Sequence, residues 1–198
     1  MKKRIQEKRR EKKYTMILSP EIKIRTKRVI MQPVRDSDIN AILEHFTSEI
    51  TRYMPFNPQG DREEIVNFVN ESKRTLSQNT DLVLVALDSN EDFIGCCGIH
   101  NITQESVELG LWLKKGVHGK GLGSEIITGL IEFLENNFTF EYILYPVDES
   151  NVASRKIPEK LGFIPAKRYK KYKDILTDLS IVEYRKYYEP AMISNKKP

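Results

Sequence analysis

Apolar residues recur with a period of two, or in short unbroken runs, at seven places along the chain, and each place predicts a β-strand. Residues 82–87 are almost wholly apolar, which is typical of a strand buried on both faces. Residues 93–99 and 107–113 follow after short polar turns, so these three strands should form an antiparallel meander. The other predicted strands cover residues 22–35, 142–147, 163–173 and 175–187.

Four other segments have the pattern of a helix, with apolar residues at intervals of three and four. The first follows residues 36–38, whose Asp and Ser side chains can cap a helix N-terminus, and Asp61 can cap the second. Asn151 can cap the fourth, which Gly162 closes. The apolar faces of the first three helices comprise Ile39, Ile42, Leu43 and Phe46; Ile65, Phe68, Val69 and Leu76; and Ile126, Ile127, Leu130, Ile131 and Leu134. The order β-α-α-β-β-β-α-β-α-β-β predicts an α/β fold, a mixed sheet with helices on its faces.

The chain has 198 residues, 39% of them hydrophobic, which favours one domain with a packed core. We expect this domain to cover residues 21–190, between a flexible basic tail at residues 1–20 and a C-terminal tail at residues 191–198. The formal net charge of +4 is concentrated at the N-terminus, because residues 1–13 carry eight Lys or Arg and two Glu. Such a tail can bind RNA or the ribosome by counterion release, or it can be a solvated extension.

The sequence offers little support for membrane, disulfide or metal chemistry. No apolar run approaches the ~20 residues that span a bilayer, and no apolar stretch follows the basic N-terminus as in a secretory signal. Cys96 and Cys97 are adjacent, so their side chains should point to opposite faces of a strand and form no intrachain disulfide. This fits a cytoplasmic protein. His45, His100 and His118 are far apart and no CxxC is present, so no metal site is predicted.

The main chemical signal is a glycine-rich segment between a predicted strand and a predicted helix. Glycines at 119, 121 and 123 let backbone N–H groups turn toward one point, and the helix adds free N–H groups and its positive dipole end. Such an arrangement binds an anion, above all a pyrophosphate. The P-loop pattern fails because Gly121 rather than Ser or Thr follows Lys120. The dinucleotide pattern G-x-G-x-x-G fails because Ser124 stands at the third glycine.

This segment resembles the acetyl-CoA motif Q/R-x-x-G-x-G/A of the GNAT superfamily of acetyltransferases, and here it reads His118-x-x-Gly121-x-Gly123. His118 replaces the usual Gln or Arg. Residues 151–154 and 159–163 are similar to the N-x-x-S and E-K-L-G-F segments of the same superfamily. The resemblance covers residues 22–187 and implies a GNAT-like fold with a splayed central sheet. Residues 50–56 and 107–113 are similar to the branch that acetylates N-terminal amines of ribosomal proteins.

The resemblance implies acetyl-CoA as the acyl donor and no metal. It assigns the pantetheine arm to the backbone of the strand ending at residue 113 and to Asn151, and the pyrophosphate to the glycine loop. Lys156 is a candidate contact for the phosphates or the adenosine end, or simply an exposed helix lysine. The residues expected to bind the donor are Leu111, Trp112, Leu113, His118, Gly119, Lys120, Gly121, Leu122, Gly123, Ser124, Asn151 and Lys156.

Glu108 is the candidate general base. The attacking amine must be neutral, although an α-amino group has a pKa near ~8 and a lysine near ~10. In a strand Glu108 shares a face with Gly110 and Trp112, on the strand expected to hold the thioester. The alternative interpretation of Glu108 is an ordinary polar residue on the outer face of a strand.

Ser154 is the candidate for assisting the leaving thiolate. It lies one helical turn from Asn151 and can donate a hydrogen bond to sulfur, or instead bond a helix carbonyl. Many GNAT enzymes use a tyrosine acid at the position occupied here by Pro158. Tyr145 is a weaker alternative donor. An acyl-cysteine intermediate is disfavoured, because no histidine partner stands at a motif spacing from the two cysteines.

The acceptor predicted by the resemblance is the N-terminal amine of a ribosomal protein. A small amine, such as an antibiotic or a polyamine, is the nearest alternative. Residues 53–60 contain no carboxylate, which favours a peptide or a neutral amine over a polyamine. The loop from Tyr53 to Phe56, together with Trp112, should line the acceptor site. The alternative for Trp112 is a role in packing alone. A different class, a non-catalytic RNA- or ribosome-binding module, is suggested by the basic tail and by residues 167–173, where aromatics interleave with Lys and Arg.

Overall fold

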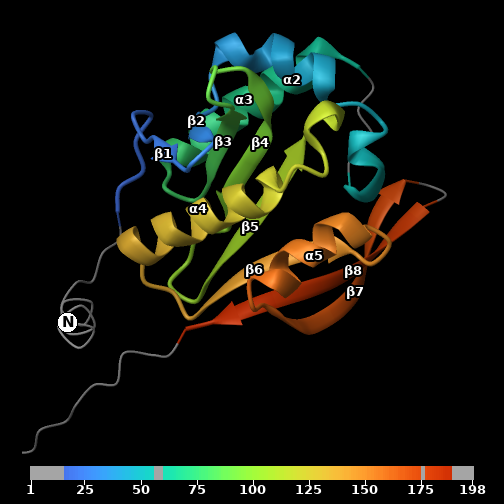
Figure 1. Ribbon diagram of the computed structural model, residues 1–198. Coiled ribbons are helices and arrows are strands. Elements are labelled where there is room, and N and C mark those ends of the chain that lie inside the picture. The colour runs from blue at the N-terminus through green and yellow to red at the C-terminus, as the bar shows by residue number, and fades with distance from the viewer. Residues whose placement is uncertain (1–15, 56–59, 175–176, 189–198) are drawn as a thin grey trace, which may run out of the picture.

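The computed structural model describes residues 16–55, 60–174 and 177–188, and eight strands in them form one sheet (Figure 1). The strand order is β1-β2-β3-β4-β5-β6-β8-β7, and every neighbouring pair is antiparallel except β5 with β6. The strands are β1 (Ile24–Arg25), β2 (Ile30–Pro33), β3 (Leu82–Leu87), β4 (Phe93–His100), β5 (Ser106–Leu113), β6 (Tyr142–Asp148), β7 (Ile164–Asp174) and β8 (Thr177–Tyr187). The predicted mixed sheet is confirmed.

The prediction of one strand over residues 22–35 is wrong, because the chain reverses between β1 and β2. Thr26 N–H donates to the carbonyl of Val29 at 2.9 Å, and Val29 N–H donates to the hydroxyl of Thr26 at 3.1 Å. These two bonds close a tight turn that the weak alternation of this segment does not reveal.

The helices are α2 (Ile39–His45), α3 (Arg62–Ser77), α4 (Leu122–Asn137) and α5 (Val152–Lys160), with short 3-10 helices η1 (Asp36–Asp38), η2 (Ile50–Tyr53) and η3 (Lys115–Val117). Asp61 and Asn151 cap α3 and α5 as predicted. The predicted side-chain cap of α2 is absent. Residues 36–38 form η1 instead, and the Asp38 carboxylate accepts a hydrogen bond from Arg35 N–H at 2.8 Å.

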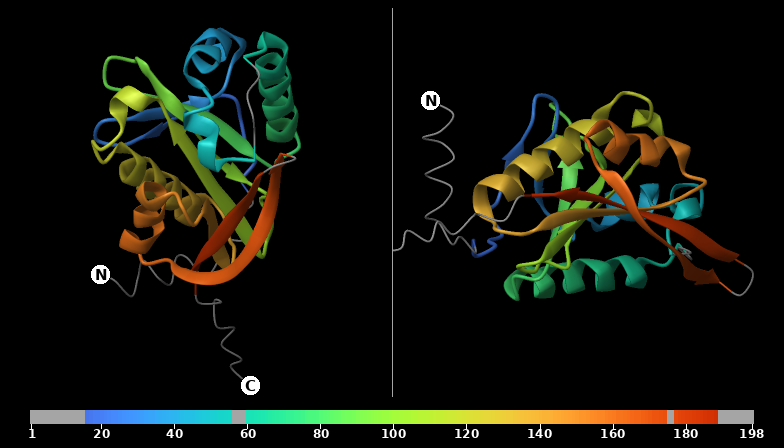
Figure 2. Two further views of the ribbon diagram at one scale, coloured as in Figure 1. Left: turned by 90° about the vertical axis from the view of Figure 1, so that its right-hand side faces the viewer. Right: turned by 90° about the horizontal axis from the view of Figure 1, so that it is seen from below.

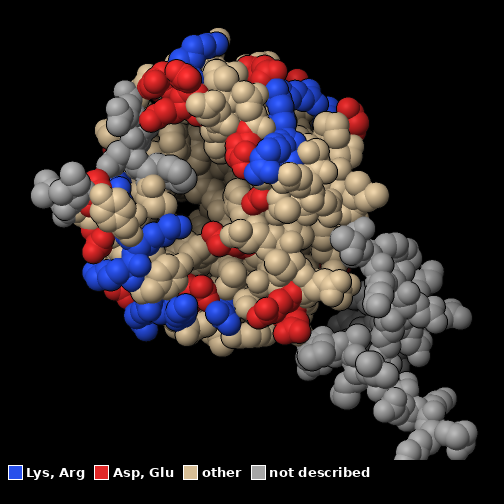
Figure 3. Space-filling model, turned by 180° about the vertical axis from the view of Figure 1, so that it is seen from behind, with Lys and Arg blue, Asp and Glu red and all other residues tan. Residues whose placement is uncertain are grey.

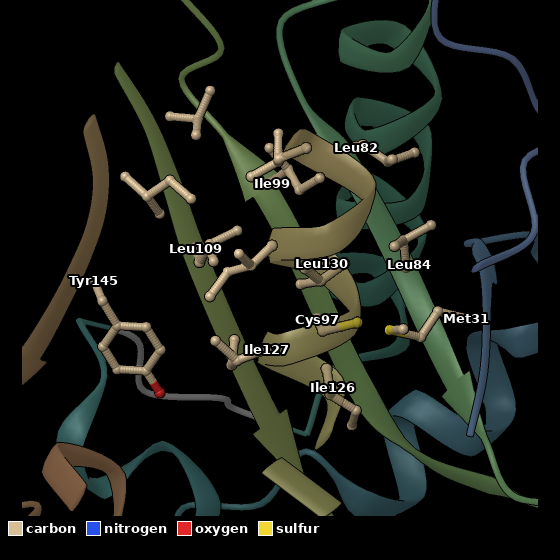
Figure 4. Close-up of a cluster of buried hydrophobic side chains, with 14 of the residues drawn as sticks. Met31, Leu82, Leu84, Cys97, Ile99, Leu109, Ile126, Ile127, Leu130 and Tyr145 are labelled. Carbon is tan, nitrogen blue, oxygen red and sulfur yellow. The ribbon is translucent and has the colours of Figure 1, made fainter. Parts of the chain in front are cut away.

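The helices cover the two faces of the sheet (Figures 1 and 2). We call the face covered by α4 and α5 the α4 face, and the face covered by α2 and α3 the α3 face. A large apolar cluster fills the α4 face and includes Met31, Leu109, Ile127 and Leu130, all at most 1% exposed (Figure 4). A smaller cluster fills the α3 face.

Cys96 and Cys97 point to opposite faces, as predicted for neighbours in a strand. Cys97 belongs to the cluster on the α4 face and Cys96 to the cluster on the α3 face. Both thiols are free and buried, and burial raises the pKa of each. Nucleophilic thiolates are therefore disfavoured at both positions.

Packing begins before residue 20, within the segment assigned to the tail. Leu18 is 6% exposed and belongs to the core, and Met16 packs against it. The basic residues 1–13 lie outside the described residues. In the part of the chain that is described, no helix combines the length and apolarity needed to cross a membrane.

Candidate active site

The sheet splays between β5 and β6. These parallel strands pair only where Ser106, Val107 and Glu108 meet Tyr142, Ile143 and Leu144, although β5 continues to Leu113 and β6 to Asp148. Beyond Glu108, the edge of β5 that faces β6 has no strand partner and its polar backbone groups are open to a ligand. The splayed sheet expected from the resemblance is confirmed.

The glycine loop lies at the C-terminal end of β5 and begins α4. Gly119 and Gly121 have φ angles of 74° and 76°, a left-handed conformation that disfavours other residues. Gly121 is the N-cap of α4, and no side chain caps that helix. The first N–H groups of α4 are therefore free to donate to an anion, and the helix dipole adds to the attraction. The geometry fits a pyrophosphate.

His118 is turned back onto β5. Its ring Nε2 lies 2.7 Å from the carbonyl oxygen of Leu113, and because that oxygen can only accept, Nε2 donates. The side chain thus braces the loop against the strand.

Arg28 also supports the loop, a contact that no sequence pattern predicts. The guanidinium lies in the β1–β2 turn, 3.1 Å from the carbonyl of Lys120 and 2.7 Å from Oε2 of Glu125. Burial acts to raise the pKa of Glu125, but hydrogen bonds from Thr26 and Arg28 outweigh it, and the pKa is lowered. The charged Glu125 therefore links the β1–β2 turn to the first turn of α4.

Ser154 and Tyr145 meet at the splay on the α4 face. Tyr145 is the first residue of β6 beyond its pairing with β5, and its hydroxyl lies 3.0 Å from Oγ of Ser154. Burial raises the pKa of Tyr145 to about 12, so its hydroxyl keeps its proton. Figure 4 shows its ring beside Ile127. Asn151 Oδ1 accepts from Ser154 N–H at 3.1 Å, which fixes the start of α5.

Lys156 and Pro158 lie on α5. Lys156 is exposed, and Pro158 is buried inside the helix where a tyrosine acid would stand in many relatives of this superfamily.

Glu108 lies at the last position paired with β6, and it is half-buried. Leu109, on the opposite side of β5, packs in the cluster of the α4 face, so Glu108 projects toward the α3 face. Its Oε2 accepts a hydrogen bond from Nδ2 of Asn101 at 3.3 Å. The predicted base and the Ser154–Tyr145 pair thus lie on opposite sides of the sheet at the same splay.

His100 lies beside Glu108 and is paired with Asp81, a contact absent from the sequence predictions. His100 is opposite Glu108 in the β4–β5 register, and its Nδ1 lies 3.4 Å from Oδ1 of Asp81. The hydrogen bond with His100 lowers the pKa of Asp81. A Cβ added to Gly98 would lie 2.5 Å from the ring of His100, so the glycine makes room for it.

Aromatic side chains and η2 border this region on the α3 face. Trp112 stacks obliquely on Phe46 and Phe93, with ring centroids 5.0 and 5.8 Å apart. Its side chain is therefore used in packing. Its backbone N–H and C=O point toward β4 rather than the splay, because Lys114, two residues further along β5, donates its N–H to the carbonyl of Ile94. Lys173 of β7 donates to the carbonyls of Thr51 and Arg52 at 2.7 and 2.8 Å. Phe56 of the predicted wall lies outside the described residues.

The α3 face is hollowed near the centre of the molecule (Figure 3). Acidic side chains border the hollow, and Lys and Arg side chains gather along one side of it. Among residues 16–55, 60–174 and 177–188, no cluster of three or more His, Cys, Asp or Glu could hold a metal ion.

Comparison with known proteins matches residues 28–164 to the family described as "Acetyltransferase (GNAT) domain". The uncharacterized N-acetyltransferase p20 of Bacillus licheniformis is 24% identical over 144 residues, which cover 70% of this chain and 80% of p20.

Solved structures share the fold. One from Salmonella typhimurium, an acetyl transferase described as modifying the N-terminal serine of the 50S ribosomal protein L7/L12, is 14% identical with a TM-score of 0.73, covering 85% of this chain and 100% of that one. Mycobacterium smegmatis RimJ, in complex with CoA-disulfide, is 16% identical with a TM-score of 0.72. The match covers 80% of this chain and 81% of the RimJ chain.

The family match spans more than half of the chain, and the GNAT fold uses acetyl-CoA. The chain belongs to the GNAT family and is an N-acetyltransferase.

Proposed function

We propose that this enzyme transfers an acetyl group from acetyl-CoA directly to the N-terminal amine of a protein, with a ribosomal protein as the first candidate. The supporting observation is the position of Glu108, where β5 and β6 separate, on the face opposite the glycine loop's helix. The donor can lie along the α4 face while the amine approaches Glu108 from the α3 face. The ribosomal acceptor is suggested by the function given for the Salmonella neighbour.

In this proposal the donor is held by backbone groups. The free N–H groups of residues 119–124 bind the pyrophosphate, and the unpaired edge of β5 at Leu111 binds the pantetheine. Trp112, the other predicted contact, is a poorer candidate because its backbone faces β4. The carbonyl of Leu113 is already used by His118. Asn151 orients α5, and Lys156 lies where a phosphate at the surface could meet it.

The proposed reaction has one tetrahedral step. Glu108 takes a proton from the acceptor ammonium, and the neutral nitrogen attacks the thioester carbonyl carbon. The C–S bond breaks, the second proton of the nitrogen passes through water to the CoA thiolate, and Glu108 returns the first proton to water. Ser154 donates a hydrogen bond to the developing thiolate with its single hydroxyl proton. Tyr145, which the raised pKa keeps protonated, therefore donates to Oγ of Ser154.

Replacing Ser154 by alanine is expected to lower kcat about tenfold with little change in the KM for acetyl-CoA, because the lost hydrogen bond forms to the leaving sulfur. Tyr145→Phe should have a smaller effect, since Ser154 remains as the direct donor. Steady-state release of CoA measures both. An S154A enzyme with unchanged kcat, or a larger loss in Tyr145→Phe, would contradict this order of donors.

A panel of acceptors tests the proposed function. Peptides with a free N-terminus, the same peptides blocked at the N-terminus but containing lysine, spermidine and an aminoglycoside are each mixed with acetyl-CoA and the full chain. We expect CoA release only with the free N-termini, and mass spectrometry should place the acetyl group on the first residue. Turnover confined to spermidine or the aminoglycoside would replace the proposal with the small-amine alternative.

Contact with RNA or the ribosome through residues 1–13 remains a prediction, since these residues lie outside the described structure. A cytoplasmic location also remains a prediction and would be required by a ribosomal acceptor.

A further inference from the structure

Strand β7 is the edge of the sheet and is strongly basic. Of its eleven residues, five are cationic: Lys167, Arg168, Lys170, Lys171 and Lys173. All of these except Lys173 are exposed. An exposed edge strand often carries lysines that prevent pairing with other chains, so this charge by itself does not define a site.

The register with β8 separates these cations by face. Arg168 is opposite Val182, which belongs to the cluster of the α4 face, so Arg168 and Lys170 lie on that side. Lys167 is opposite Glu183 and Lys171 is opposite Leu179, so both lie on the α3 face with Glu108.

The two groups of cations differ in their partners. On the α4 face, Nε of Arg168 bonds Oε1 of Glu149 at 2.8 Å, and Nζ of Lys170 bonds Oγ of Ser180 at 2.7 Å. On the α3 face, Lys167 contacts only the ring of Tyr169, at 5.5 Å. No carboxylate of the described residues pairs with Lys167 or Lys171. Among the described residues, the exposed cations of β7 that have neither a hydrogen bond nor an ion pair are therefore Lys167 and Lys171, on the side of the proposed base.

Carboxylates lie deeper on the same face. Tyr169 alternates with Arg168 and Lys170 along β7 and so shares the α3 face with Lys167 and Lys171, and burial and the charges of Glu183 and Glu108 raise its pKa. Glu183 is paired with Arg185 at 2.6 Å, whereas Glu108 contacts only the neutral Asn101. Charge thus changes sign from Glu108 at the splay to Lys167 and Lys171 at the edge, which agrees with the hollow and its basic side in Figure 3.

We propose that the acceptor is a polypeptide with acidic residues shortly after its N-terminus, and that Lys167 and Lys171 hold these residues while the terminal amine lies at Glu108. This inference rests on the proposed function and specifies the class of its acceptor. An RNA is the poorer fit to Lys167 and Lys171, because the exposed aromatic of β7, Tyr172, lies on the other face of the strand, with Arg168 and Lys170.

The test uses three peptides that share their first three residues and continue with an acidic, a neutral or a basic segment. At low salt we expect kcat/KM to follow the order acidic, neutral, basic. The double variant Lys167→Gln, Lys171→Gln should lower kcat/KM for the acidic peptide about three- to tenfold through KM, and leave the neutral peptide unchanged. The preference for the acidic peptide should shrink as the salt concentration rises, because ion pairs made by the exposed Lys167 and Lys171 are screened.

Lys170→Gln is the matched control, since it removes one charge from the same strand on the opposite face. This variant should leave kcat/KM for all three peptides unchanged. Equal turnover of the three peptides, or an equal loss in K170Q, would overturn the inference while the proposed function stands. If an RNA oligonucleotide binds and all three lysines contribute alike, the surface is a nucleic-acid site and the inference is wrong. If no peptide is acetylated at all, the proposed function itself fails.

Discussion

Replacing Glu108 by glutamine is expected to lower kcat/KM for the acceptor amine by about two to three orders of magnitude near pH 6–7, the contribution typical of a positioned general base. Glutamine has nearly the same shape and its amide oxygen can still accept from Asn101, so the fold should be retained. The deficit should narrow toward pH 9, because an α-amino group with a pKa near ~8 is then mostly neutral without help.

A pH profile of kcat/KM between 6 and 9 for both enzymes measures this effect. Glu132→Gln provides the control, because Glu132 is exposed on α4 and should show wild-type rates at every pH. Full activity of E108Q over the whole range would reject Glu108 as the base. A deficit that is equally large at pH 6 and pH 9 would indicate that Glu108 positions the amine rather than deprotonating it.

Gly121→Val is expected to weaken acetyl-CoA binding at least about tenfold. Its φ of 76° is costly for a β-branched residue, by roughly 1–2 kcal/mol or more, and relaxing the strain would turn the N–H groups of the loop away from the anion. Loss of one charge-assisted hydrogen bond costs about 1.5–3 kcal/mol, which corresponds to a factor of about 10–100 in affinity. Isothermal titration with acetyl-CoA measures this change.

Gly162→Val is the matched control for the backbone strain. Gly162 has a φ of 79° and an added Cβ would meet nothing within 4 Å, but it closes α5 rather than the loop. Both variants should lose a few degrees of Tm, since about 1 kcal/mol corresponds to roughly 2–4 °C in a chain of this size. Only Gly121→Val should lose affinity for acetyl-CoA. Equal affinities in the two variants would refute the role assigned to the loop.

Most of the fold could be predicted from the sequence, because its long elements have strong periodic patterns. The apolar run of β3 was predicted to the residue, and the helix after the glycine loop was recognised from its 3.6-residue period. The errors concern short elements. The β1–β2 turn and η1 each depend on one polar side chain that can bond the backbone in more than one way, Thr26 in the first and Asp38 in the second.

Only part of the candidate site could be predicted from the sequence. Glycines 119 and 121, the Asn151 cap and the face of Glu108 follow from local spacing. Three features depend on residues distant in sequence. They are the brace of Arg28 on Glu125, the pair Asp81–His100 and the hydrogen bond between Tyr145 and Ser154.

The glycine loop and its following helix were therefore determined by the sequence itself, because a left-handed turn and free helix N–H groups require only the residues that form them. The splay of β5 from β6, by contrast, was decided by tertiary structure. So was the division of the exposed β7 cations, with the hydrogen-bonded Arg168 and Lys170 on the α4 face, and Lys167 and Lys171 without such a bond to the described residues on the α3 face. Both depend on which strands become neighbours, and strand pairing is set by packing across the whole sheet.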